Sequence, residues 1–200
     1  VPSLGGHGRG THFFIMPASD LLEDDIDAET ADRASPLQKS LLGFTNTMTP
    51  DHEEPVIRCA FRDYRTDDAH HDLIGENEFF TPDEFFNADH HFVGEFDEYG
   101  QFRGKVSIYG EEGEYSVTWP KARGIPTRCG PFRFGLAEVM GNQSETTVPF
   151  DEYARMVSKM RRIGGLYVYR EGIRILPYGD TDFDWLDIEF NRSKGAGYYH

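Results

Sequence analysis

Apolar residues recur along this chain at two spacings, and each spacing predicts one kind of secondary structure. Helical spacing, with apolar residues three and four positions apart, predicts helices over 35–48 and 151–163. Ser35 and Gln38 offer a capping box at the start of the first helix, and Gly164 follows the last turn of the second. The second helix also ends in basic residues, which suit the negative end of a helix dipole.

Alternation of apolar and polar residues predicts strands in the rest of the chain. In its middle part, three such strands are joined by short segments that contain glycine, at 97–100 and 110–113, and together they predict an antiparallel meander. The predicted strands span residues 11–16, 56–64, 91–96, 102–109, 114–119 and 132–140.

The segment 164–179 carries the clearest hairpin signal. Glu171 and Gly172 stand between two alternating runs, and a two-residue turn with positive φ favours glycine. Taken together, these elements predict an α+β fold in which a mixed or antiparallel sheet is covered by the helix 151–163.

Composition narrows the classes of partner. With 38% of its 200 residues hydrophobic and 14% aromatic, the chain has enough apolar material for one good core or two small ones. A formal net charge of −15 repels phosphate backbones and anionic lipids, which predicts no membrane association and no unaided nucleic-acid binding. Cys59 and Cys129 are two thiols in a chain that is large enough to fold without a stabilising disulfide. They therefore favour a reducing, cytoplasmic setting.

The first residue is Val1 rather than Met, and a glycine run follows within a few positions. This start predicts that the chain is a segment of a longer protein. No apolar run approaches the roughly 20 residues that a membrane-spanning helix needs.

Two stretches of the chain resemble one protein family. The first is His7-Gly8-Arg9-Gly10-Thr11-His12-Phe13-Phe14-Ile15, a Gly-Thr dipeptide entering a predicted strand, and the second is 164–179 together with Asp184-Trp185-Leu186-Asp187-Ile188-Glu189. They are similar to the last nucleotide-site motif and to the transducer domain of the GHKL superfamily of ATPases. That superfamily includes DNA gyrase B, MutL, the MORC proteins and the ninety-kilodalton heat-shock chaperone.

The resemblance implies a fold, two binding residues and a set of partners. Residues 1–50 would be the C-terminal remnant of a Bergerat-type ATP-binding sandwich, and 51–200 a transducer-like domain that is incomplete at its C-terminus. Gly10 and Thr11 would contact nucleotide, because the family's Thr hydroxyl helps hold the adenine-contacting carboxylate and a water, and a hydroxyl both donates and accepts hydrogen bonds. The complete parent would use ATP and Mg²⁺ and close as a homodimer on a protein or nucleic-acid client.

Other family features do not occur in this chain. The helix whose Glu and Asn activate water and hold magnesium, and the Asp-x-Gly-x-Gly adenine motif, lie upstream of the matching Gly-Thr in the family. The basic residue that reaches the γ-phosphate is expected beyond the hairpin, where Arg192 and Lys194 are the stand-ins that this chain offers. We therefore assign no catalytic residue, and the chain alone is expected to bind no cofactor and to lack ATPase activity.

Three further groups of residues could have a chemical or binding function, but a structural role explains each of them. Histidines and carboxylates gather in two places, but adjacent strand residues point to opposite faces, so we predict exposed side chains and no metal site. The cysteines are expected to be small buried hydrophobes. The meander's aromatic residues are expected to be core, although they also support the alternative of a non-enzymatic module that binds a protein partner. The residues concerned are Asp68, His70, His71, Asp72, Asp89, His90 and His91 for the metal, and Phe92, Phe96, Phe102, Tyr109, Tyr115 and Trp119 for the meander.

Overall fold

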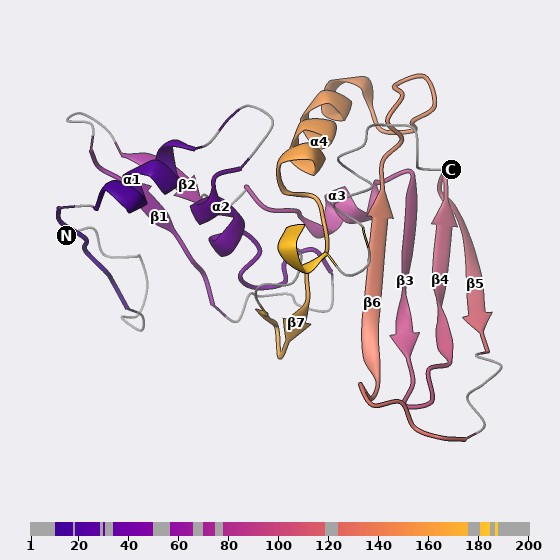
Figure 1. The fold of residues 1–200 in the computed structure, drawn as a ribbon. Helices are drawn as coiled ribbons and strands as arrows, with labels where there is room; N and C mark the ends of the chain where they lie inside the picture. The colour runs from indigo at the N-terminus through magenta and orange to yellow at the C-terminus, as the bar shows by residue number, and fades with distance from the viewer. Residues whose placement is uncertain are drawn as a thin grey trace.

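The computed structural model confirms the α+β class, with antiparallel sheets and few helices (Figure 1). It describes residues 11–17, 19–28, 30, 34–49, 57–65, 70–74, 78–118, 124–175, 181–184 and 187. In chain order the elements are α1 (Asp20–Asp27), α2 (Pro36–Leu41), β1 (Phe61–Asp63), β2 (His71–Ile74), α3 (Pro82–Phe86), β3 (His90–Phe96), β4 (Phe102–Ile108), β5 (Glu111–Val117), β6 (Phe132–Glu138), α4 (Phe150–Ile163), β7 (Tyr169–Arg170), β8 (Ile173–Arg174) and the 3₁₀ turn η1 (Thr181–Phe183).

The largest sheet has the strand order β5-β4-β3-β6, and every neighbouring pair is antiparallel. The predicted meander forms β3, β4 and β5, but the predicted turn at 110–113 is wrong. Tyr109 and Gly110 make the turn, with φ of 51° and 82°, and β5 begins at Glu111. A two-residue turn with both φ values positive matches the twist of paired strands, so it displaces the longer turn that the glycines suggested.

The first predicted helix is shorter than its apolar spacing indicated. The capping box of Ser35 and Gln38 forms, but α2 ends at Leu41 instead of continuing to residue 48. Gly43 follows with a φ of +66°, and the Phe79 ring occupies the space that a Cβ at this position would need. The chain therefore turns here because only glycine permits this backbone beside that ring.

Two predicted strands also differ from the structure. Of the strand predicted over 56–64, the structure describes residues 57–64, and within these Phe61–Asp63 pairs with β2. Residues 11–15 are not assigned to a strand, and their apolar side chains are exposed, with Phe13 retaining 85% of its surface. An apolar run of this kind forms a strand only when a neighbouring sheet supplies hydrogen-bonding partners.

The main hydrophobic core lies away from the faces of the large sheet. It joins residues on both sides of the predicted boundary at position 50, and it is packed by α1, α2, β2 and the end of α4. Its buried members are Ile26, Ala34, Leu42, Leu73, Ile74, Phe79 and Ile163.

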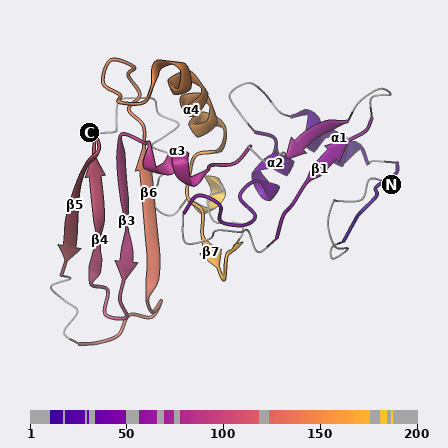
Figure 2. The same cartoon turned by 180° about the vertical axis from the view of Figure 1, so that it is seen from behind.

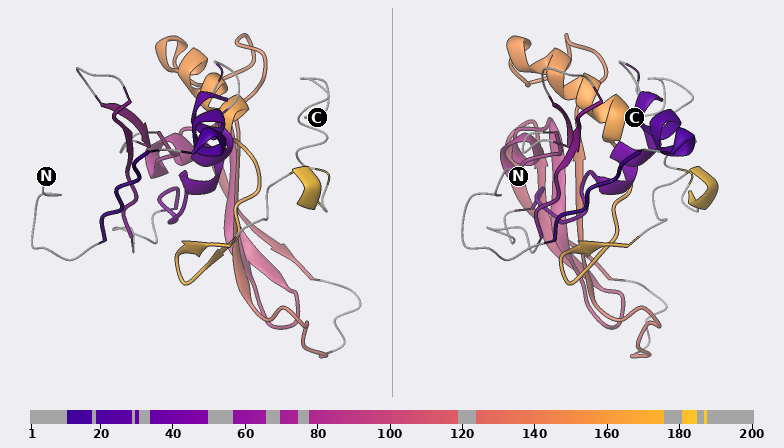
Figure 3. Two further views of the ribbon diagram at one scale, coloured as in Figure 1. Left: turned by 60° about the vertical axis from the view of Figure 1, so that its left-hand side comes forward. Right: turned by 90° about the vertical axis from the view of Figure 1, so that its left-hand side faces the viewer.

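Helix α4 forms almost as predicted, but it stands beside the end of the large sheet next to α3 instead of covering a face (Figures 1 and 2). Glu84 of α3 holds it there. The Glu84 carboxylate, only 8% exposed, accepts hydrogen bonds from Lys159 Nζ at 3.0 Å and from Arg155 Nη1 at 2.6 Å. The far half of the sheet therefore projects beyond the helices (Figure 3).

The predicted hairpin is confirmed and is fastened to the segment that follows α2. Strands β7 and β8 are joined by Glu171 and Gly172, with φ of 54° and 78°. The Tyr169 hydroxyl donates to the Gly43 carbonyl at 2.8 Å, and Arg174 Nη1 donates to the carbonyls of Lys39 and Leu42 at 2.6 and 3.0 Å. These bonds connect parts of the chain that lie more than a hundred positions apart.

Candidate functional site

Strand alternation gives the large sheet two faces of opposite character. The pairing register places His90, Phe92 and Phe96 of β3 on the same face as Phe102 of β4 and Phe132 of β6. We call this surface the aromatic face. Its remaining members are Gly94, Gly104, Val106, Ile108, Glu111, Gly113, Tyr115, Val117, Phe134, Leu136 and Glu138.

The opposite surface, which we call the charged face, carries charged side chains that favour contact with water. Glu95 of β3 lies directly across from Arg103 and Arg133, and Lys105 lies across from Glu114. Opposite charges on facing strands attract each other and solvate well. An antiparallel sheet normally turns one face to water and the other to a core, so the aromatic face has the composition of a core face.

Near the helices, the charged face is covered by α3. His91 is buried there, with its ring 5.2 Å from the Phe86 ring and 6.1 Å from the Phe85 ring between centroids. Burial lowers the pKa of His91, because the charged imidazolium loses its hydration in this apolar setting. This part of the sheet is thus closed on the charged side, while the aromatic side stays open.

The centre of the aromatic face is built on two facing glycines. Gly94 and Gly104 are paired across β3 and β4, and a Cβ at either position would overlap the Phe102 ring. The ring lies over both glycines and is 2% exposed, with Phe92 stacked beside it at 4.5 Å between centroids. Sequence reasoning missed these glycines, although their phase within the alternation places them among the phenylalanines.

The most exposed side chains of the aromatic face lie around this buried centre. Tyr115 and Val117 on the edge strand β5 expose 50% and 40% of their surface, and Phe132 and Leu136 on the edge strand β6 expose 45% and 56%. Two apolar ridges therefore flank the lower surface above Phe102.

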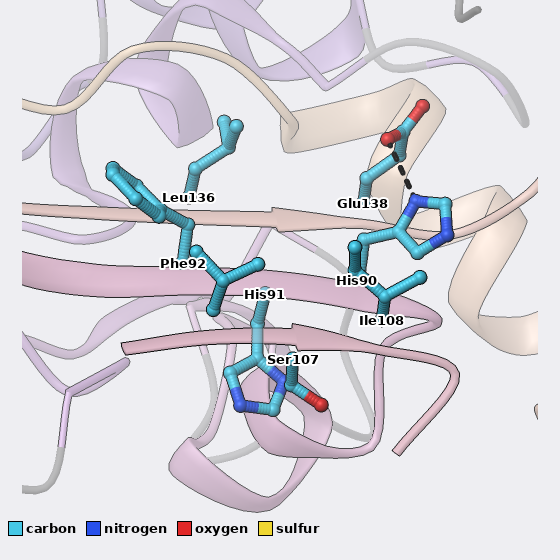
Figure 4. A pocket seen from close by; sticks show the side chains of 8 residues that line it. His90, His91, Phe92, Ser107, Ile108, Leu136 and Glu138 are labelled. Carbon is cyan, nitrogen blue, oxygen red and sulfur yellow. Dashed lines mark hydrogen bonds and ion pairs between the residues drawn. The ribbon is translucent and has the colours of Figure 1, made fainter. Parts of the chain in front are cut away.

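A shallow hollow of about 270 Å³ opens on the aromatic face at the end near the helices. Phe92 and Val106, which are paired across β3 and β4, both line it. Ile108 of β4 and Leu136 of β6 line it as well (Figure 4). His90 and Glu138 close one end, with His90 Nδ1 3.2 Å from a Glu138 carboxylate oxygen. Small-molecule pockets usually enclose about 300 to 1,000 Å³, so this open hollow has the size for one large side chain.

The polar groups around the hollow do not form a nucleophile and base. Figure 4 shows the His90 ring turned toward Glu138, while Ser107 lies on the charged side of the sheet, where it is 2% exposed. The remaining polar residue that lines the hollow is His91, whose ring faces α3. The arrangement therefore suits binding of an apolar side chain better than acyl transfer.

Of the two residues predicted to bind nucleotide, the structure describes Thr11 and not Gly10. Thr11 is exposed in the extended segment at the start of the described chain, while Gly10 lies outside the described residues. Arg192 and Lys194 also lie outside them. The structure therefore leaves the nucleotide role of Gly10 and Thr11 as a prediction.

The candidate metal ligands separate into unrelated environments. His90 and His91 point to opposite faces of the sheet, as adjacent strand residues must. Asp89 is fully buried and accepts hydrogen bonds from the Met140 and Thr147 amides. His70 lies 3.6 Å from Asp72 on the surface, and Asp68 is outside the described residues. Within the described part of the chain, no three His, Cys, Asp or Glu side chains are grouped to hold a metal ion.

The two cysteines differ from each other. Both are free thiols; Cys59 is half-buried, and burial raises its pKa. Cys129 is exposed, so the prediction that both would be buried hydrophobes is wrong for this residue. It lies within the turn 127–130, in which the Gly130 amide donates to the Thr127 carbonyl at 3.4 Å.

The chain matches no protein-family model, and no curated protein or solved structure is significantly similar to it. Within the described residues, none of the helices has the length and apolar character that crossing a bilayer requires. The described residues define an α+β protein whose principal antiparallel sheet presents an aromatic face that none of the described helices covers.

Proposed function

We propose that this chain is the coupling part of a larger ATP-binding, ATP-hydrolysing protein of the GHKL type, chaperone-like or MORC-like. In this proposal Gly10 and Thr11 form one wall of the nucleotide pocket, and the 164–179 hairpin belongs to the transducer. ATP, Mg²⁺ and the catalytic groups reside in the complete parent, which closes as a homodimer in the cytoplasm. The segment alone contributes no catalytic residue.

One structural observation carries this proposal: the hairpin that resembles the transducer is bonded to residues 44–46 after α2, within the predicted remnant of the ATP-binding domain. The Arg174 amide donates to the Phe44 carbonyl at 2.8 Å, and the Asn46 amide donates to the Gly172 carbonyl at 3.2 Å. Thr45 and Ile173 form a further antiparallel bridge. A shift of residues 44–46 would therefore reach the hairpin through these hydrogen bonds, which are lost when their atoms move apart.

The exposed segment 11–16 also supports the proposal. Phe13 and Met16 retain 85% and 91% of their surface, and the segment pairs with no strand among the described residues. Such a run is typical of a core strand that completes its pairing in a neighbouring sheet. The ATP-binding domain of the parent would supply that sheet.

Calorimetry tests the nucleotide site on the full-length parent, with a non-hydrolysable ATP analogue and Mg²⁺. We expect Thr11→Ala to weaken binding about tenfold, because the lost hydroxyl contributes ~1.4 kcal/mol, whereas Thr11→Ser keeps the hydroxyl and the affinity. Thr118→Ala, at an exposed position after β5, is the matched control. Equal affinities for Thr11→Ala and wild type would contradict the site.

Hydrogen exchange tests the coupling separately. The amides of Asn46 and Arg174 make the bonds between the hairpin and the α2 segment, so their protection should change when the ATP analogue binds. Amides in the β3–β4 ladder serve as an internal reference. Nucleotide binding without any change at Asn46 and Arg174 would leave a binding site but remove the coupling function.

The aromatic face favours a second function from another class, a non-enzymatic module that binds a protein through its sheet. Leu136 and Ile108 expose 56% and 53% of their surface on a face that otherwise has the composition of a core. Exposed apolar patches of this kind mark protein interaction sites. A variant carrying Leu136→Lys that keeps its fold and its partner binding would contradict this function.

A further inference from the structure

We propose that the aromatic face is a self-association surface, on which a second copy of this chain packs its own aromatic face. This inference concerns the large sheet and does not rest on nucleotide binding. It also places a copy-to-copy contact at a defined surface, away from segment 11–16.

The charge pattern of the aromatic face favours a partner surface that is itself uncharged. Its ionisable groups are Glu111, His90 and Glu138, and the register places all three at the end near the helices. The projecting half carries Phe96 paired with Phe102 and Phe132, and no Asp, Glu, Lys or Arg. A strongly charged partner would therefore find no counter-charge there. The −15 net charge of each chain makes two copies repel each other, and salt screens this repulsion.

The shape of the aromatic face also suits contact with a second copy of itself. Apolar ridges on β5 and β6 flank the lower surface above Phe102, which is 2% exposed. In a two-fold arrangement, a ridge of one copy lies over the low centre of the other, and the reverse contact forms at the same time. The hollow of about 270 Å³ between Ile108 and Leu136 accepts one more large side chain. Such a surface is complementary to itself.

The exposed apolar area of the aromatic face is large enough for a contact between two copies. Ile108, Tyr115, Val117, Phe132 and Leu136 each expose between 40% and 56% of their surface. These side chains together present roughly 500 Å², so two copies would bury about 1,000 Å², which reaches the threshold for a specific interface. Stacked sheets pack about 10 Å apart, and the projecting half of the sheet lets them do so without contact between the helices.

Sedimentation velocity on the full chain, from about 1 μM to about 100 μM, tests the inference over the range in which interfaces near this size dissociate. We expect the wild type to form dimers as its concentration rises. Tyr115→Lys places an unpaired charge in the interface and should raise the dissociation constant at least about a hundredfold. Ser116→Lys introduces the same charge one position along β5 on the charged face, and should leave the dimer unchanged.

Tyr115 contacts the rings of Phe92 and Phe102, so its replacement also perturbs packing within the sheet. Leu136→Lys, at the most exposed of the five positions, provides a second variant, and far-UV circular dichroism establishes that each protein is folded. A wild type that stays monomeric throughout would overturn the inference, whether the face is then covered by another part of the chain or by a different protein. Dimers that persist in folded Tyr115→Lys and Leu136→Lys would overturn it as well.

Failure here is distinguishable from failure of the nucleotide proposal. The dimer measurement uses no nucleotide, and the Thr11 experiments involve no residue of the large sheet. A monomer that binds ATP would remove only the self-association surface, and a dimer without nucleotide affinity would remove only the ATP site.

Discussion

Replacement of Asp89 probes how the loop after β6 is held against the start of β3. The Asp89 carboxylate is fully buried and accepts hydrogen bonds from the Met140 amide at 2.8 Å and the Thr147 amide at 2.5 Å. The hydroxyls of Thr146 and Thr147 donate to it at 2.8 Å each. Asp89→Ala leaves both amides without their acceptor.

The expected loss follows from the number of donors. Each unsatisfied amide costs about 1–3 kcal/mol, so Asp89→Ala should lower the free energy of unfolding by about 4 kcal/mol, while the hydroxyls can turn elsewhere. Asp89→Asn keeps one carbonyl oxygen but turns an amino group toward the remaining donors, and should lose about half as much. Asp25→Ala, at an exposed position of α1, should change stability by less than about 0.5 kcal/mol.

The same carboxylate makes stability depend on pH. Burial raises the pKa of Asp89, but the hydrogen bonds from Met140 and Thr147 outweigh burial, so its pKa lies below the usual range. A group with a lowered folded-state pKa stabilises the fold above its unfolded pKa of about 3.9, and this stability is lost as pH falls through the folded pKa. The difference between wild type and Asp89→Asn should therefore be full at neutral pH and narrow in acid.

Urea unfolding followed by far-UV circular dichroism measures these differences, with midpoints and slopes compared at neutral and acidic pH. The reasoning is refuted if Asp89→Ala unfolds within about 1 kcal/mol of wild type, or if the gap between wild type and Asp89→Asn is the same at both pH values.

Two further experiments test the sheet and the thiols. Gly94→Ala should destabilise the protein by about 2 kcal/mol in thermal unfolding, because its Cβ overlaps the Phe102 ring and a backbone carbonyl; Gly113→Ala on β5, where nothing lies within 4 Å, should be tolerated, and equal losses would contradict this account. Cys129 should react with a thiol reagent faster than Cys59, since Cys129 is exposed while burial raises the pKa of Cys59 and lowers its thiolate fraction; comparable rates would refute the assigned environments.

Local patterns predicted the elements whose cause is local. The alternation of apolar residues was sufficient for β3, β4 and β6, and the Glu171-Gly172 dipeptide for the hairpin turn. The capping box of Ser35 marks the start of α2 in the same way. In each case residues within four positions of one another supply the deciding contact, so the sequence contains the whole explanation.

The end of α2 shows where such reasoning stopped. Apolar spacing continued to residue 48, yet the helix ends at Leu41, because Phe79 packs against Gly43 from more than thirty positions away. The segment 11–16 has the composition of a strand and lacks a paired neighbour among the described residues. A strand requires a second chain segment for its hydrogen bonds, and periodicity does not name that segment.

The aromatic face likewise depends in part on the sequence and in part on the tertiary structure. Alternation alone assigns Phe92, Phe102 and Tyr115 to one side of the meander, and sequence reasoning took that side for core. The tertiary structure decided that α4 does not cover it, because α4 is held at the end of the sheet by the bonds of Lys159 and Arg155 to Glu84. Sequence determines which side chains share a face, because that depends on backbone geometry within one strand; what lies against the face depends on contacts between distant segments, which only the folded chain establishes.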